Sequence, residues 1–313
     1  MNSSLSTPSQ QIPPEKKGNK FTSFFNSKKV APYVFVVPFI LSFLILYLYP
    51  FVYAIIMSFQ QVLPGQTEFI GLQNYERLMN PTFYRAVFNT TIYVICTVII
   101  LVVVPLLLAV LLNSRLTKLK ILFRTAFFMP ALTSVIVAGV IFNMIFSESD
   151  SAAANQVLAW IGLDSVDWQY NAVTGMFLMV ALASWRWIGV NIMYFLAALQ
   201  NISDDLYEAA DIDGANAFQK FYYVTLPALK PIVIFVSTIT IINGFRMFEE
   251  SFVFWETSSP GNIGLTVVGY IYQAGIQQND MGFGAAIGVF LMIIILVVSL
   301  IQLKFFGAFK KDE

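Results

Sequence analysis

Four ionisable side chains lie inside long apolar stretches of the sequence, namely Arg186, Arg246, Glu249 and Glu250. An ionisable group in hydrocarbon costs several kcal/mol unless it faces an opposite charge or a water-filled cavity. Arg246 precedes the two glutamates by three and four residues, so these three side chains share one face of a predicted helix. Salt bridges within that helix are the expected arrangement, and a role in a polar cavity or in docking a partner protein is the alternative.

Aromatic and amide side chains surround the first of these arginines. Trp185 and Trp187 flank Arg186, and Asn191 follows in the same stretch. Aromatic rings offer flat apolar faces, and Arg and Asn donate hydrogen bonds to hydroxyl groups. These residues, with Asn243 in the following stretch, are therefore suited to line a passage for a polar solute. The alternative is that Arg186 pairs with a carboxylate at a subunit interface while the tryptophans pack on lipid or on a second subunit.

Residues that commonly carry out catalysis are scarce in this chain. It has no histidine, which is the commonest general base and transition-metal ligand, and its one cysteine, Cys96, lies in an apolar run. It also has no Gly-rich loop ending in Gly-Lys-Ser or Gly-Lys-Thr, so it lacks a phosphate cradle for ATP hydrolysis. We therefore predict no enzyme activity, no catalytic residue, no metal site and no cofactor in this chain.

The composition predicts that membrane helices position these residues. Of 313 residues, 58% are hydrophobic and only 12% are charged, whereas soluble chains carry about 25% charged residues. Stretches long enough to cross a hydrocarbon layer of ~30 Å as helices occur at residues 32–58, 85–113, 124–146, 174–200, 231–252 and 281–303. We predict an all-α membrane protein of about six transmembrane helices, with a disordered tail at 1–30, a transmembrane domain at 31–308 and a short tail at 309–313.

The basic residues predict the orientation in the cell membrane, because Lys and Arg in short connections stay on the cytoplasmic side. Fourteen of the 18 lie in the N-terminal tail, the second and fourth connections and the C-terminus, whereas residues 147–173 contain four acids and no base. Both termini and the connection 201–230 are therefore predicted to be cytoplasmic. The polar N-terminal tail has no short apolar core with a small-residue cleavage site, so we expect the first helix to be retained.

Two connections carry apolar sequence of their own. Residues 263–276 are too short to span, so we expect an interfacial or partly buried outer hairpin. In the connection 201–230, Ser203 suits the cap of a short helix and Gly214 suits the turn that ends it. A second, aromatic segment is expected to end at Pro227 and Pro231. The product is a helix-turn-helix whose apolar face, outside the bilayer, is typical of a segment that binds a protein groove.

This connection resembles the coupling loop, with its EAA motif, of permease subunits of ABC importers. The residues that carry the resemblance are Glu208, Ala209, Ala210, Asp213, Gly214, Leu226 and Pro227. Val224 stands where these permeases usually have Ile. The similarity covers nearly the whole chain beyond the N-terminal tail and is to the carbohydrate branch of type I importers, in which segments similar to 123–130 and 183–200 occur.

The resemblance implies a non-catalytic subunit that is driven by other chains. In such importers a second homologous permease completes a heterodimer, two ATPase subunits each accept one coupling loop and bind ATP and magnesium, and an extracellular sugar-binding protein delivers the cargo. The partners are then these proteins and the lipid bilayer, with no nucleic acid. Glu208 is expected to anchor the loop, by a hydrogen bond at the helix start or to the ATPase, and Gly214 to allow its turn.

The resemblance also implies a cargo. Segments 183–187, 243–251 and 259–266 are similar to those of permeases for arabino-oligosaccharides or related plant-derived sugars. From the chemistry of the residue types, the expected substrate pathway consists of Trp185, Arg186, Trp187, Asn191, Asn243, Arg246, Glu249 and Glu250. The turn at 259–261 departs from the Thr-x-Gly-Gly-Pro turn of many sugar permeases, which leaves the particular sugar open.

Three other functions compete with sugar import. An ABC permease for an anionic solute such as a glycerol phosphate ester would use the two arginines, although the neighbouring glutamates favour a neutral cargo. A secondary transporter would show internal repeats and broken helices with an ionisable coupling residue, and it would leave the loop unexplained. A membrane enzyme would need a constellation of nucleophile, base or metal ligands, which the composition does not supply.

Overall fold

The computed structural model describes residues 31–114, 119–256 and 258–306, and its contacts divide the chain into two units, Met1–Ala54 and Ile55–Glu313. The predicted tails at 1–30 and 309–313 lie outside the described residues. The first unit contains α2, the π-helix η1 and the start of α3, whose bounds are Ala31–Phe43, Leu44–Leu48 and Tyr49–Met57. These elements form one candidate membrane span, Pro32–Met57, as the sequence predicted.

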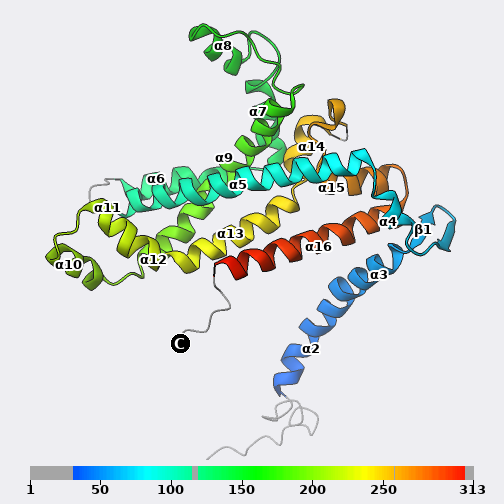
Figure 1. Cartoon of the computed structure of the whole chain (residues 1–313), viewed down its shortest axis with the longest axis horizontal. Helices are drawn as coiled ribbons and strands as arrows, with labels where there is room; N and C mark the ends of the chain where they lie inside the picture. Colours follow the sequence, from blue (N-terminus) through cyan, green and yellow to red (C-terminus); the bar gives the residue numbers. More distant parts are fainter. Residues whose placement is uncertain (1–30, 115–118, 257, 307–313) are drawn as a thin grey trace, which may run out of the picture. The chain divides into compact units, whose positions relative to one another are not determined.

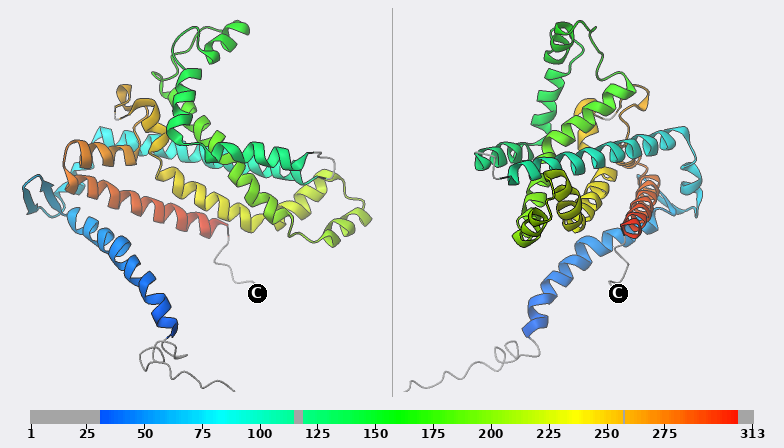
Figure 2. Two further views of the ribbon diagram at one scale, coloured as in Figure 1. Left: turned by 180° about the vertical axis from the view of Figure 1, so that it is seen from behind. Right: turned by 60° about the vertical axis from the view of Figure 1, so that its left-hand side comes forward.

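Four long helices form the body of the second unit. They are α5 (Pro81–Asn113), α9 (Ala172–Leu199), α13 (Lys230–Phe245) and α16 (Met281–Phe305). Helix α5 packs along α9 and α13, and α13 also packs on α16 (Figures 1 and 2). The side chains of Asn80, Asn171 and Asp280 cap α5, α9 and α16 by accepting hydrogen bonds from first-turn N–H groups. These caps explain why the three helices begin within a few residues of the predicted starts.

The core between α5, α9 and α13 is built from aliphatic and aromatic side chains. Ile192, Phe195 and Leu229 in this cluster are 0% exposed. Helix α9 also approaches the preceding segment closely at Gly189, where a Cβ atom would lie 1.9 Å from the carbonyl oxygen of Phe127. Only glycine allows that approach, so Gly189 sets how α9 meets the third predicted span.

The third predicted span, 124–146, is not one straight helix. It consists of α6 (Lys120–Phe128), the 3₁₀ turn η2 (Met129–Leu132) and α7 (Val135–Ile145), and the two parts meet at a bend of 98°. Pro130 lacks a backbone N–H, and Thr133 and Ser134 have extended backbone angles that end the helical hydrogen bonding. Among the described residues, five helices are long and apolar enough to span a membrane, or six if this bent pair is one span. The prediction of about six spans agrees with that range.

The fifth predicted span, 231–252, is interrupted. Helix α13 ends at Phe245, and α14 begins at Glu249 and ends at Trp255, although together they still form one candidate span. Arg246 leaves the helical conformation with φ −90° and ψ 5°, and Phe248 has φ −139°. The sequence pattern predicted one helix face for Arg246 and the two glutamates, and this prediction is wrong because the break separates them.

Short elements complete the second unit. Strands β1 (Gln60–Leu63) and β2 (Gln66–Phe69) form an antiparallel hairpin that the sequence did not predict, followed by α4 (Gln73–Arg77). Residues 260–277 form η4 (Pro260–Asn262), α15 (Val267–Ile271) and the π-helix η5 (Tyr272–Gln277). Because α15 packs on α5 and α16 and buries Val267, the expected partial burial is confirmed, but α15 runs directly into η5 and the expected hairpin within this segment is wrong.

The connection between α7 and α9 contains a helix, α8 (Ala153–Trp160), that the sequence pattern did not predict. Together α7 and α8 project away from α5, α13 and α16 (Figures 1 and 2), while α7 still packs on α9 and α14. Asn155 is 0% exposed and organises this connection, because its side-chain oxygen accepts hydrogen bonds from the Val166 N–H and the Trp168 indole N–H. One buried amide therefore joins α8 to the segment that follows it.

Candidate functional site

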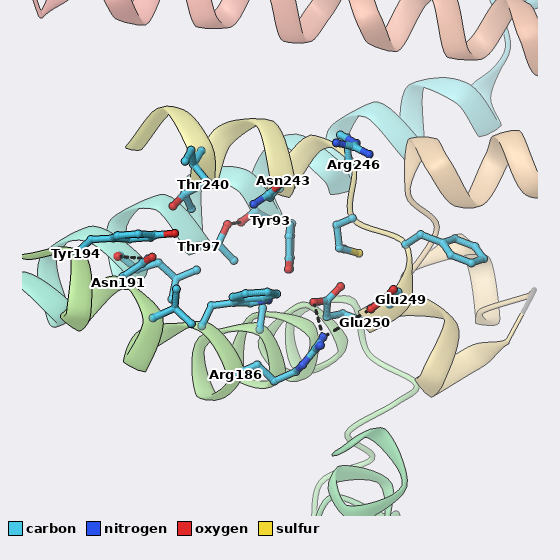
Figure 3. A pocket seen from close by; sticks show the side chains of 18 residues that line it. Tyr93, Thr97, Arg186, Asn191, Tyr194, Thr240, Asn243, Arg246, Glu249 and Glu250 are labelled. Carbon is cyan, nitrogen blue, oxygen red and sulfur yellow. Dashed lines mark hydrogen bonds and ion pairs between the residues drawn. The ribbon is translucent and has the colours of Figure 1, made fainter. Parts of the chain in front are cut away.

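A cavity of about 470 Å³ lies between α5, α9, α13 and the start of α14. Figure 3 labels ten residues that line it, which are Tyr93, Thr97, Arg186, Asn191, Tyr194, Thr240, Asn243, Arg246, Glu249 and Glu250. The lining also includes the rings of Trp187 and Phe248. Polar groups and aromatic rings thus converge from three spans on one hollow, which is the usual composition of a small-molecule site.

Arg186 joins two helices at this cavity. Its Nη1 atom lies 3.7 Å from Glu249 Oε2 and 3.7 Å from Glu250 Oε1, so α9 is ion-paired to the start of α14. The side chain of Glu250 is 10% exposed and that of Glu249 is 62% exposed. The buried Glu250 is therefore the partner that depends on Arg186, because an unpaired carboxylate in that environment would be strongly unfavourable.

The charges of the cavity balance. Two arginines and two glutamates line it, and Arg186 carries both of the ion pairs that reach the glutamates in the described structure. Arg246 also lines the cavity and is exposed there. The Nε atom of Arg186 is buried without a hydrogen-bond partner among the described residues. The cavity thus presents donor groups without a net charge.

The three residues 185–187 point in different directions, because consecutive helical residues are rotated by about 100° around the helix axis. Arg186 and Trp187 line the cavity, and the guanidinium of Arg186 lies 5.5 Å from the Trp187 ring centroid. Trp185 is not part of the lining, and its ring centroid lies 5.9 Å from that of Phe142 on α7. The structure therefore brings seven of the eight predicted pathway residues to the cavity and leaves Trp185 outside it.

Asn191 has a structural partner as well as a place in the lining. Its Nδ2 atom donates a hydrogen bond of 2.8 Å to the carbonyl oxygen of Leu101, which is 90 residues away in the sequence. Four residues after Leu101 the helix contains Pro105, which has no N–H to donate back to that oxygen. Asn191 supplies the donor that the proline removes, so it stabilises α5 and cross-links it to α9.

Several lining residues were missed by the sequence interpretation. Tyr93 and Thr97 lie four residues apart on α5, and Tyr194 and Thr240 come from α9 and α13. The hydroxyls of Thr97 and Thr240 donate to carbonyls of their own helices, which is how such residues are accommodated in apolar spans. Polar residues recurring every three to four positions within a span were the available signal.

Helix α14 is also held at the end away from the cavity. Asn143 of α7 donates a hydrogen bond to the Val253 carbonyl at 2.9 Å, and Gln169 donates to the Asn143 side-chain oxygen at 2.8 Å. The indole of Trp255 donates to the Gln169 carbonyl at 2.9 Å. This short helix is therefore fixed between the cavity and the connection that follows α8.

The connection 201–230 forms a helix-turn-helix, as predicted. Helix α10 covers Asp204–Ile212, and the hydroxyl of Ser203 accepts a hydrogen bond from the Asp205 N–H. Gly214 has φ +75°, so it ends α10 in the left-handed conformation expected from the sequence. The helix-start role considered for Glu208 falls to Ser203, because Glu208 lies in the middle of α10.

The second half of this connection differs from its prediction. It contains α11 (Ala217–Lys220), the π-helix η3 (Phe221–Thr225) and α12 (Leu226–Ala228). Pro227 and Pro231 do not end the segment, because helical structure continues from Ala217 through Pro227 to Ala228, and Pro231 stands in the first turn of α13, where a missing N–H costs nothing. Helical structure therefore runs through the loop into α13 with only a short break.

The loop exposes apolar side chains to solvent. They are Leu206, Ile212, Phe218, Tyr222 and Tyr223, each at least half exposed. Of the predicted coupling residues, Glu208, Ala209, Asp213, Gly214 and Pro227 are exposed, and Ala210 and Leu226 are half-buried. Among the residues that the structure describes, no group of three or more Cys, Asp or Glu side chains could hold a metal ion.

Comparison with known proteins assigns these features to a family. Residues 78–309 match the family described as binding-protein-dependent transport system inner membrane component. The chain belongs to this family. As a member it is a multi-pass membrane component of a transport system and not an enzyme, which confirms the resemblance to importer permeases seen in the sequence.

Individual relatives refine the comparison. This permease is 68% identical to the arabinooligosaccharides transport system permease protein AraP of Halalkalibacterium halodurans, over 95% of this chain and 94% of that protein. It is 58% identical to AraP of Bacillus subtilis, over 96% of each chain. Its fold matches a chain in the crystal structure of a bacterial ABC transporter involved in alginate import, with a TM-score of 0.81, 24% identity and coverage of 94% and 100%.

Proposed function

We propose that this permease carries neutral oligosaccharides through the cavity between α5, α9 and α13, and that arabino-oligosaccharides or related plant-derived sugars are its cargo. The observation that carries this proposal is the charge-balanced, aromatic lining, with two arginines and two glutamates around one hollow. The names of the two AraP relatives support the choice of sugar. An extracellular binding protein delivers the cargo, in keeping with the description of the family.

The chemistry of the lining suits a sugar. Trp187 and Tyr194 offer ring faces for the C–H surfaces of a pyranose or furanose, and Asn243 offers an amide that both donates and accepts hydrogen bonds. The charge of Arg186 is balanced by the glutamates of α14. A neutral, hydroxyl-rich solute meets these groups without leaving a buried charge uncompensated.

An anionic solute such as a glycerol phosphate ester is the second candidate. It is favoured by Arg246, which lines the cavity and has no carboxylate within ion-pairing distance in the described structure. It is disfavoured by Glu249, whose exposed carboxylate would repel an anion entering the same cavity. The neutral cargo is therefore the better match to the lining as a whole.

The energy for transport comes from ATP hydrolysis by other polypeptides. We propose that a second, homologous permease completes the channel, and that two ATPase subunits bind ATP and magnesium and accept the coupling loops. The exposed apolar side chains of this loop form the surface that binds the ATPase. Glu208 contacts the ATPase, and Gly214 maintains the left-handed turn of the loop. The distribution of basic residues supports cytoplasmic positions for this loop and both termini. Closure of the ATPases then rocks the helices between inward and outward states.

Reconstitution tests the proposed cargo. The permease, its partner permease and the ATPase are placed in vesicles, and binding proteins loaded with pentose or hexose oligomers are scanned for stimulated ATP hydrolysis. We expect stimulation and uptake with arabino-oligosaccharides and none with glycerol phosphate esters. The reverse pattern would favour the anionic solute, and stimulation by neither class would reject both candidates.

A further inference from the structure

The coupling loop contains a polar cross-link between its two halves. The hydroxyl oxygens of Tyr207 on α10 and Thr225 at the end of η3 lie 2.9 Å apart, in hydrogen-bond distance. Thr225 is 5% exposed, so this bond is shielded from water on one side. The two residues are 18 positions apart, and the bond therefore closes the whole helix-turn-helix.

From Thr225 the chain leads directly to the cavity. The Leu229 N–H donates to the Thr225 carbonyl and the Val233 N–H donates to the Leu229 carbonyl, each at 2.9 Å. Leu229 is 0% exposed in the core between α5, α9 and α13. Helix α13 then carries Thr240 and Asn243 to the cavity. A hydrogen-bonded and packed path thus joins η3 to the lining of the cavity.

We propose that the Tyr207–Thr225 hydrogen bond makes α10 and η3 move as one rigid unit. Tyr207 and Thr225 are then positioning residues for the coupling of ATP hydrolysis to transport. The inference rests on the proposed docking of an ATPase at this loop. Without the bond, α10 would be attached to η3 mainly through the turn at Gly214, and a push on α10 would be absorbed there. With the Tyr207–Thr225 bond in place, a displacement of α10 also displaces η3 and, through it, the start of α13.

A second cross-link in the loop serves as a matched control. Lys220 forms an ion pair with Asp211, also between the two halves, but the side chains are 25% and 62% exposed. Ion pairs that face solvent contribute little because water and salt screen them. We therefore expect the shielded Tyr207–Thr225 bond to keep α10 fixed to η3, and we do not expect this of the Lys220–Asp211 ion pair.

The test measures sugar transported per ATP hydrolysed in the reconstituted importer, normalised to the amount of assembled complex. Tyr207→Phe and Thr225→Val each remove one hydroxyl, and we expect this ratio to fall about fivefold, as for the loss of about 1 kcal/mol. Thr225→Ser keeps the hydroxyl and should retain the ratio, as should Asp211→Asn. The double variant should be no worse than Thr225→Val alone, because Thr225→Val already removes the bond to Tyr207 as well as the 3.4 Å bond from its hydroxyl to the Lys220 carbonyl.

Two results would overturn the inference while leaving the docking proposal in place. One is a normal ratio in Tyr207→Phe and Thr225→Val while Gly214→Val lowers it. The other is a reduced amount of assembled complex with a normal ratio, which would make the bond purely structural. If Gly214→Val also keeps a normal ratio, the coupling role of the loop itself is wrong.

Discussion

The cavity and the coupling loop organise their polar groups in opposite ways. In the cavity, Asn191 bonds a carbonyl 90 residues away, and Arg186 pairs with glutamates on a different helix. In the loop, Ser203 caps its own helix, and Asn216 and Gln219 form a reciprocal capping box within one turn. The cavity therefore depends on how helices pack, whereas most of the loop is specified by its local sequence.

This difference predicts which property a substitution changes. Polar groups that join packed spans contribute to stability and to transport together, because the same contact holds the helices and shapes the cavity. Polar groups in a locally determined loop contribute to the transmission of movement and little to the stability of the membrane domain. Four substitutions, ordered from the largest expected effect to the smallest, test this separation.

Arg186→Ala should have the largest effect. It leaves the carboxylate of Glu250, 10% exposed, without its partner, and breaking a buried pair in this way costs about 3 kcal/mol. We expect a lower thermal unfolding temperature of the purified complex and loss of uptake. Glu249→Gln is the matched control, because that side chain is 62% exposed, and it should change stability little. Equal effects of Arg186→Ala and Glu249→Gln on unfolding would contradict the buried pairing.

Gly214→Val should act on transport and not on stability. Valine is strongly disfavoured at φ +75°, and strain of about 1–3 kcal/mol would distort the turn of the loop. We expect uptake to fall more than tenfold while the amount of protein inserted in the membrane stays the same. Gly214→Asn should be milder, because asparagine adopts left-handed angles more readily. Normal uptake with valine would show that the turn is not needed for coupling.

Asn191→Leu should destabilise α5 by about 1.5 kcal/mol, because the carbonyl oxygen of Leu101 loses its donor. The decisive measurement is the same substitution in a Pro105→Ala background. Alanine restores an N–H four residues after Leu101, so the helix satisfies that oxygen itself and the cost of Asn191→Leu should shrink. An unchanged cost in the double variant would mean that Asn191 stabilises the protein by another contact.

Asn243→Ala should have the smallest effect on stability and a selective effect on transport. Its side chain is exposed in the cavity, so truncation leaves no buried group unpaired. We expect uptake of the sugar at low concentration to fall about fivefold through loss of one hydrogen bond, with an unchanged unfolding temperature. Unchanged uptake would remove Asn243 from the substrate pathway.

The sequence predicted the first half of the loop well, and the second half of the loop and the cavity incompletely. Ser203 and Gly214 have the expected roles because caps and left-handed turns depend on neighbouring residues. Arg246 was expected to pair along its own helix, and the prediction failed because the chain leaves the helix at that residue. Trp185 was expected in the pathway, but its direction around α9 depends on where the neighbouring helices lie.

By itself the sequence determined that this is a membrane protein with about six spans and a helix-turn-helix in one connection, because hydropathy and capping are properties of short segments. Only the tertiary structure decided that Arg186 neutralises the glutamates of α14 and that Asn191 compensates for Pro105. Those contacts join residues far apart in the chain. Their partners follow from helix packing and from two breaks in predicted spans, at Pro130 and Arg246, whose geometry short sequence patterns do not define.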